Sequence, residues 1–375
     1  MDRVAKVSAV EGPGGIAAGG QSLPNLYKED RMKQALTRFV VAGTMMFTAT
    51  AALAAGELNI FNWGNYTSPE MIKKFEAKFD VKVTITDYDS NDTALAKIRA
   101  GGHGYDMVVP SASFIPIYVK EGLLEQTMPN DMPNFKNVDR RWADPPFDPG
   151  RMYTVPWQWG TTGVIVNTKI FTGDINTSAI FLDPPPELAG KINVVPELTE
   201  IIMLTVLYFG GEPCTNDKEL LKKVRDKLLE AKAKWTSMDY AAPEIYAKGD
   251  LAAGVNWNGY SSRARLLNPD YKFGFPKEGF PVWMDNLAVV KGATNLENAK
   301  LFQNFMMEPE NAAMLSNFAR YRDGLIGSEA FYDADLKSAP EINMDADTLK
   351  RGHFSLTCEP ETQQLYARIW SEVMK

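Results

Sequence analysis

Residues 58–86 read LNIFNWGNYTSPEMIKKFEAKFDVKVTIT, and the first unit of the fold can be read from them. The apolar run 58–63 predicts a strand that ends at a Gly-Asn turn. A helix is predicted to begin at Pro69, because Thr67 or Ser68 can cap it and apolar residues then recur at helical spacing. The alternating run 82–86 predicts a second, half-buried strand.

The same alternation continues along the chain. A helix is predicted over 91–100, closed by two glycines, and a strand over 106–110 leads into Ser111. The resulting β-α-β-α-β order is typical of a doubly wound α/β sheet, in which ligands collect at the carboxyl ends of the strands. Trp63 and Ser111 both follow such strand ends.

A second alternating series follows an irregular connection over 128–156 that is rich in Pro, Asp and Trp. Such a long chain exceeds what one hydrophobic core usually serves, so we expect two lobes. The expected strands span 163–167, 192–195, 254–257 and 282–290, and the expected helices lie near 199–209, 217–234, 296–307, 309–319 and 361–375.

Residues 1–55 are predicted to be a leader and signal peptide. Lys33 and Arg38 precede an apolar run that ends in small residues near Ala54 or Ala55, where we expect cleavage. Because the run is shorter than the roughly 20 residues of a spanning helix, we expect no membrane insertion of the mature chain. A translation start at Met32 would explain the charged, Gly-rich residues upstream of it.

Without residues 1–54 the chain carries 34 basic and 43 acidic residues, a formal charge of −9. This balance argues against a nucleic-acid partner. It favours cationic ligands through long-range attraction, although solubility alone also explains it.

Cys214 and Cys358 are the only cysteines, and in an oxidising compartment they either form one disulfide or remain free. The two histidines, His103 and His353, stand far apart in ordinary loop sequence. We therefore expect neither a metal site nor a cofactor.

Aromatic and acidic residues recur at predicted strand ends and helix starts, in the stretches 62–66, 196–200, 256–260 and 283–285. Ammonium groups removed from water need carboxylate partners, and aromatic rings suit both aliphatic carbons and cations. An aromatic box with carboxylates at its ends therefore fits an alkyl amine. Taken singly, a Trp in a strand packs more often in the core, and a Glu at a helix start usually caps the helix.

From about residue 57 onward, the chain resembles the periplasmic polyamine-binding proteins, the putrescine and spermidine receptors of ABC importers. The resemblance rests on an ordered set of motifs rather than on any single one. The matching segments are Phe61-Asn62-Trp63 with Tyr66, residues 105–114, Phe147-Asp148-Pro149, Val155-Pro156-Trp157, Gly163, Trp257-Asn258-Gly259, residues 275–279 and Met284-Asp285.

This resemblance implies a two-lobed periplasmic binding protein fold of type II, in which each lobe is a mostly parallel sheet flanked by helices. A hinge would join lobe 1 (57–161 and 284–329) to lobe 2 (162–283 and 330–375), and the lobes would close on the ligand. The implied partners are a small-molecule amine and the permease subunits of an ABC transporter. We expect a periplasmic monomer.

The resemblance also implies the binding residues. Asp285 and Glu200 would serve amine nitrogens, with Asp285 the more important, and Ser111 would offer a hydrogen bond. The ligand's hydrocarbon would be lined by Trp63, Tyr66, Trp257, Trp283 and Tyr321.

The chain departs from the family pattern at one end of this site. Gly64-Asn65 and Tyr260 stand where polyamine binders commonly have acids. Arginines stand at positions that are usually uncharged, namely Arg263, Arg320 and Arg322.

These departures lead to a second hypothesis, in which the ligand is a monoamine or a zwitterion such as GABA or another ω-amino acid. An arginine would then pair with the ligand's carboxylate. Alternatively, the arginines point to solvent or bond a neighbouring acid such as Asp323.

Two other classes of protein were considered. Glu200 and Asp285 could serve an enzyme as paired carboxylates acting on a glycoside. The sequence lacks a Gly-x-Ser-x-Gly elbow, a His-Glu-x-x-His motif, a phosphate-cradling Gly loop and a histidine in the expected pocket, so we expect no enzymatic activity. An iron or anion receptor of the same architecture would favour tyrosines, histidine and carboxylates over a set of tryptophans.

Overall fold

The computed structural model describes residues 56–375 apart from residue 241. The predicted leader, signal peptide and alternative start at Met32 lie outside the described residues. Within them the strands form one sheet in the order β2-β1-β3-β8-β4-β6-β5, with β7 beside β4 and β9 beside β8. The strands are β1 (Gly56–Trp63), β2 (Val81–Tyr88), β3 (Met107–Val108), β4 (Thr154–Asn167), β5 (Ile192–Val194), β6 (Ala253–Trp257), β7 (Tyr271–Gly274), β8 (Phe280–Val289) and β9 (Gly352–Phe354).

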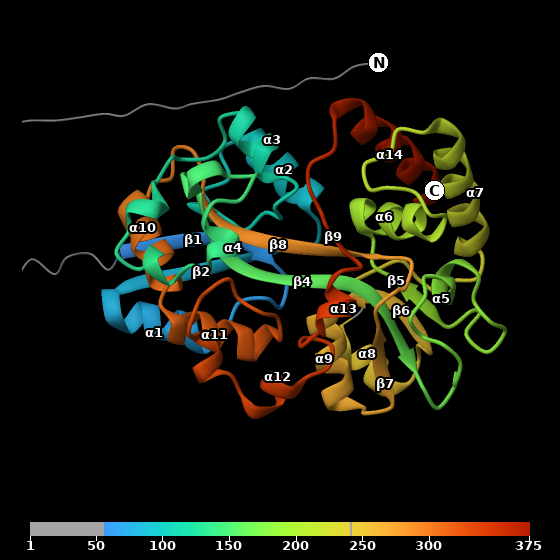
Figure 1. Cartoon of the computed structure of the whole chain (residues 1–375). Helices are drawn as coiled ribbons and strands as arrows, with labels where there is room; N and C mark the ends of the chain where they lie inside the picture. The colour runs from blue at the N-terminus through green and yellow to red at the C-terminus, as the bar shows by residue number, and fades with distance from the viewer. Residues whose placement is uncertain (1–55, 241) are drawn as a thin grey trace, which may run out of the picture. The chain divides into compact units, whose positions relative to one another are not determined.

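Helices cover the sheet on both faces. Figure 1 shows α2 and α3 on the opposite side of β1 and β2 from α1 and α11, and α6, α7 and α14 on the opposite side of β5 and β6 from α8 and α9. The α-helices are α1 (Pro69–Phe79), α2 (Asn91–Ala100), α3 (Ile115–Lys120), α4 (Arg140–Ala143), α5 (Ala179–Leu182), α6 (Leu198–Tyr208), α7 (Lys218–Lys232), α8 (Pro243–Lys248), α9 (Asn258–Leu267), α10 (Leu296–Met306), α11 (Pro309–Ala319), α12 (Ala334–Ser338), α13 (Ala346–Leu349) and α14 (Pro360–Val373). Short 3-10 turns span Pro129–Asp131, Phe135–Asn137, Pro149–Arg151 and Ser328–Phe331.

The predicted β-α-β-α-β opening is confirmed. β1 pairs in parallel with both β2 and β3. Ser68 caps α1 by accepting a hydrogen bond from the Met71 amide, and Pro69 occupies the first turn. The helix ends at Asp80, which adopts a left-handed conformation with φ of 53°. Because the capping interactions are local, the sequence alone could predict where this helix begins.

Strand β4 is much longer than the predicted strand 163–167. Its first half pairs with β8, from Thr154 opposite Ala288 to Thr161 opposite Val282. A proline normally argues against a strand interior, and Pro156 lies in this half. The register shifts between Pro156 and Gln158, so the strand accommodates the ring at an irregularity.

The sheet is mixed rather than mostly parallel. β4 runs antiparallel to β8, β6 and β7, and β3 is antiparallel to β8, whereas β5 and β6 pair in parallel. The antiparallel pairs all involve β4 or β8, two long strands that pair with each other, and Figure 1 shows them side by side through the middle of the sheet. β4 pairs with β8 up to Thr161 and with β6 from Thr162 onward. This change of partner lies at the predicted boundary between residues 161 and 162. The boundaries themselves stay a prediction.

The predicted helices over 199–209, 217–234, 296–307, 309–319 and 361–375 are confirmed as α6, α7, α10, α11 and α14. The sequence pattern missed the short elements β7, α3 and α8, whose apolar periodicity extends over too few residues to stand out. It also missed α9, whose first half contains glycine and serine, which are poor helix formers. None of the described helices combines the length and apolarity needed to cross a membrane.

Cys214 and Cys358 form a disulfide, across a sequence separation of 144 residues. The bond joins the segment between α6 and α7 to the segment that leads into α14. It therefore ties the C-terminal helix to the part of the fold built around β5 and β6.

Replacing both cysteines with alanine should lower the free energy of unfolding by about 2–5 kcal/mol, because the bond restrains a long loop in the unfolded chain. Urea unfolding followed by circular dichroism measures this difference. Wild-type protein treated with a reductant is the control and should show a similar loss. A change of less than about 1 kcal/mol in both samples would contradict the expectation.

Candidate functional site

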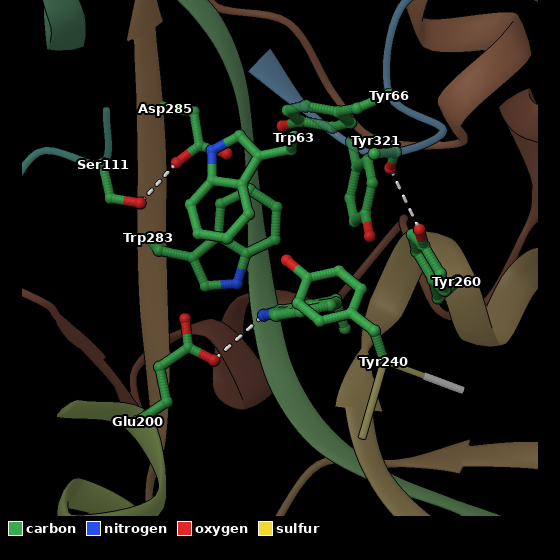
Figure 2. A pocket seen from close by; sticks show the side chains of 11 residues that line it. Trp63, Tyr66, Ser111, Glu200, Tyr240, Tyr260, Trp283, Asp285 and Tyr321 are labelled. Atoms are coloured by element: carbon green, nitrogen blue, oxygen red, sulfur yellow. Dashed lines mark hydrogen bonds between the residues drawn. The ribbon is translucent and has the colours of Figure 1, made fainter. Parts of the chain in front are cut away.

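A narrow pocket with a cavity volume of about 30 Å³ lies where β1, β6 and β8 meet the loops and helices that follow them (Figure 2). This volume is far below the range of about 300–1,000 Å³ that is usual for small-molecule sites, because the lining side chains pack against one another. The structure brings together all eight residues predicted to bind the ligand, which are Trp63, Tyr66, Ser111, Glu200, Trp257, Trp283, Asp285 and Tyr321.

Asp285 lies on β8 with only 5% of its surface exposed. The Ser111 hydroxyl donates a hydrogen bond of 2.6 Å to its Oδ1 atom. Burial raises the pKa of Asp285 to about 7, although the nearby Ser111 and Tyr66 hydroxyls act in the opposite direction. The carboxyl group is thus poised to lose its proton near neutral pH.

Glu200 stands in the first turn of α6. Its Oε2 atom accepts hydrogen bonds from Thr162 Oγ1 at 2.6 Å and from Trp257 Nε1 at 2.9 Å. Burial raises the pKa of Glu200 to about 7, the charge of Asp285 adds to this, and the two donors oppose it. Neither Glu200 nor Asp285 has a basic partner within 4 Å among the described residues.

The aromatic side chains pack edge to face around the pocket. The ring of Tyr321 lies 5.5 Å from that of Tyr66 and 5.1 Å from that of Trp283. Trp63 and Trp257 meet at 6.4 Å. Such T-shaped contacts stabilise the rings beyond the burial of their area and hold the wall of the pocket in one shape.

Two glycines allow this close packing. A Cβ atom at Gly259 would lie 2.5 Å from the ring of Tyr321, and one at Gly160 would lie 2.6 Å from the ring of Trp283. Any other residue at either position would displace a wall of the pocket. This is a structural reason for the glycine in the stretch Trp257-Asn258-Gly259.

Sequence reasoning assigned no binding role to three residues at or near the site, although Glu197 and Tyr260 lie in stretches that it singled out. Tyr240 and Tyr260 line the pocket, and the Tyr240 ring lies 4.8 Å from Trp257. Glu197 is buried at the start of α6, but its side chain makes no capping hydrogen bond, and its Oε1 atom has no partner among the described residues. Burial and the charge of Glu200 raise its pKa well above the usual value. The stretch 196–200 was the sequence signal for Glu197, but only the structure shows that this acid is buried without a cap interaction.

The structure does not place the three arginines among the lining residues of the pocket. Arg320 pairs with Asp335 and Asp333, and Arg322 pairs with Glu329 and bonds Asn343. Asp323 is not their partner, because its oxygens accept hydrogen bonds from hydroxyl groups that include those of Ser328 and Tyr332. The guanidinium of Arg263 lies 5.5 Å from the centre of the Tyr260 ring.

The model of the bacterial extracellular solute-binding proteins matches residues 70–344. This range covers more than half of the chain and includes most of the pocket. The chain belongs to the bacterial extracellular solute-binding protein family.

Relatives within this family share sequence over most of their length. The spermidine/putrescine-binding periplasmic protein 1 of Haemophilus influenzae is 29% identical over 82% of this chain and 86% of its own length. The putrescine-binding periplasmic protein SpuD of Pseudomonas aeruginosa is 27% identical over 92% of this chain and 98% of its own. A putative spermidine/putrescine ABC transporter structure from Listeria monocytogenes superposes with a TM-score of 0.80 at 28% identity, covering 85% of this chain and 99% of that one.

The solute-binding protein therefore has the predicted two-lobed fold of type II. It is not an enzyme, because its relatives and structural neighbours are substrate-binding proteins.

The raised pKa values predict how the stability of the ligand-free solute-binding protein depends on pH. The folded protein keeps protons on Asp285 and Glu200 that the unfolded chain releases near pH 4, so this contribution is present below about pH 4 and is lost as pH rises through 7. In Asp285→Asn, part of this dependence should vanish. Between pH 5 and 8, the free energy of unfolding of the variant, measured by thermal melts, should rise relative to that of the wild type by up to a few kcal/mol. Parallel curves for the two proteins would contradict the expectation.

Proposed function

We propose that the protein captures a small amine of the putrescine and spermidine class in the periplasm and delivers it to the permease subunits of an ABC importer. The names of the relatives support this ligand class and location, since they include spermidine/putrescine- and putrescine-binding periplasmic proteins. The secretion step would use the signal peptide predicted within residues 1–55.

One observation carries the proposal: the pocket holds carboxylates that no basic side chain neutralises among the described residues that line it. Buried acids are costly unless they are paired or protonated. Asp285 and Glu200 have hydroxyl and indole donors instead of a cationic partner. A ligand ammonium group would supply the missing charge.

The proposed roles follow from this arrangement. Asp285 and Glu200 bind amine nitrogens, and Ser111 holds Asp285 in position through the hydrogen bond to Oδ1. The aliphatic carbons lie against rings that also favour cations, which are those of Trp63, Tyr66, Trp257, Trp283 and Tyr321.

Glu197 is a third candidate for the charge of the ligand. Its carboxyl is buried close enough to Glu200 for their charges to interact, and it also raises the pKa of Tyr240. Binding a cation would stabilise the ionised form of each acid, so ligand binding should release protons near neutral pH.

The competing hypothesis of an ω-amino acid requires a cation in the pocket for the carboxylate of the ligand. No lysine or arginine is among the described lining residues. Arg320 and Arg322 already have acidic partners, and Arg263 donates a hydrogen bond to the carbonyl oxygen of Asn65. The geometry therefore favours a ligand with positive charge alone.

Calorimetric titration of the mature protein with putrescine, spermidine and GABA should give micromolar or tighter binding of at least one polyamine and no binding of GABA. The affinity for the polyamine should increase from pH 6 to 8, because ionisation of Asp285 and Glu200 precedes cation binding while the amine stays protonated. GABA binding in the absence of polyamine binding would establish the ω-amino acid instead.

Asp285→Ala should abolish measurable binding of every amine ligand, because it removes the carboxylate that Ser111 positions. Asp226→Ala, which removes an exposed acid on α7, is the matched control and should bind normally. Calorimetry gives the affinities, and circular dichroism verifies that both variants fold. If Asp285→Ala stays within about threefold of the wild type, or roughly 0.7 kcal/mol, the site is misplaced.

A further inference from the structure

One end of the pocket is closed by direct contacts between two distant segments. The Tyr260 hydroxyl donates a hydrogen bond of 3.2 Å to the carbonyl oxygen of Gly64. One turn further along α9, Arg263 Nη1 donates to the carbonyl oxygen of Asn65 at 3.3 Å. Gly64 and Asn65 follow β1, and α9 follows β6, so these contacts join the groups of strands on either side of the β4–β8 pair.

Arg263 also supports the Tyr260 ring from outside the pocket. Its guanidinium lies 5.5 Å from the centre of the Tyr260 ring and 5.6 Å from that of Phe318. Cation–π contacts of this kind hold both partners and leave the positive charge next to the ring. Tyr260 is therefore braced by a backbone carbonyl at its hydroxyl and by a cation at its face.

The charge in the pocket is distributed unevenly. Figure 2 shows Tyr260 on the side of the pocket away from Asp285, Ser111 and Glu200. The charges that act on the Tyr260 phenol are those of Arg263, Asp87 and Glu244, and burial is the main reason that its pKa is raised. The end at Tyr260 is therefore lined by a neutral phenol, and the charged groups near it, Arg263, Asp87 and Glu244, do not line the pocket.

We propose that Tyr260, held by the Gly64 carbonyl and braced by Arg263, is a cap that limits the length of the ligand. The site then takes a short diamine whose ammonium groups both lie within reach of the carboxylates, and it rejects a longer triamine. This inference rests on the proposed function, because it specifies which amines the same pocket admits.

The physical reason is the closed end of the pocket. A longer chain that extends toward Tyr260 would have to break the hydrogen bond between the Tyr260 hydroxyl and Gly64, and its third ammonium group would approach the guanidinium of Arg263. The carboxylates of Asp87 and Glu244 also act on Tyr260, but neither residue lines the pocket. Both costs fall on spermidine and spare putrescine.

Binding of putrescine and spermidine to the wild type and to Tyr260→Ala tests the cap. The wild type should bind putrescine at least about tenfold more tightly than spermidine, a difference of about 1.4 kcal/mol. Tyr260→Ala should reduce this preference by about tenfold, mainly through tighter spermidine binding. Tyr208→Ala, which removes a partly exposed tyrosine that is hydrogen-bonded to Asp183 and does not line the pocket, is the matched control and should keep the wild-type preference.

A measurement without ligand separates failure of the cap from failure of the proposed function. In Tyr260→Phe the backbone amides of residues 64–66 should exchange hydrogen faster than in the wild type, because the bond to Gly64 is lost. Equal binding of both amines by the wild type would overturn the cap while leaving the amine site intact. If the wild type binds neither amine, the proposed function fails and the length selection fails with it. Unchanged amide exchange would overturn the contact itself.

Discussion

Strands β4 and β8 pair in antiparallel register from Thr154 opposite Ala288 to Thr161 opposite Val282, and the positions of both groups of strands depend on this pairing. Beyond Thr161, β4 continues beside β6 and β7, while the other end of β8 pairs with β3. The same register sets Trp283 opposite Gly160, which leaves room for the indole. One pair of strands therefore both connects the fold and positions a wall of the pocket.

The pocket concentrates acids where their ionisation is unfavourable. Burial raises the pKa values of Asp285, Glu200 and Glu197, and the like charges reinforce one another. This arrangement costs stability in the ligand-free protein at neutral pH, and a cationic ligand would offset the cost. Stability given up at a site is commonly recovered as binding energy, which explains why a fold would keep unpaired carboxylates here.

The contacts of Tyr260 and Arg263 make the two ends of the site chemically different. Its acids lie at one end, and a phenol with a guanidinium behind it lies at the other. Hydrogen bonds from this end reach the carbonyl groups of Gly64 and Asn65 across the middle of the sheet, so the same residues that shape the pocket also hold the two groups of strands together. Ligand selection and closure would then depend on one another, since a chain that displaces the phenol also breaks these contacts.

The sequence by itself determined the β-α-β-α-β opening, the capped helices and the kinds of residue in the site, because caps, periodicity and strand ends are local features. Family resemblance selected which of those residues belong together. Only the tertiary structure decided the first half of β4, the mixed sheet, the disulfide, the acidic partners of Arg320 and Arg322, and the places of Glu197, Tyr240 and Tyr260. Each of these depends on contacts between residues distant in sequence, which local propensity does not encode.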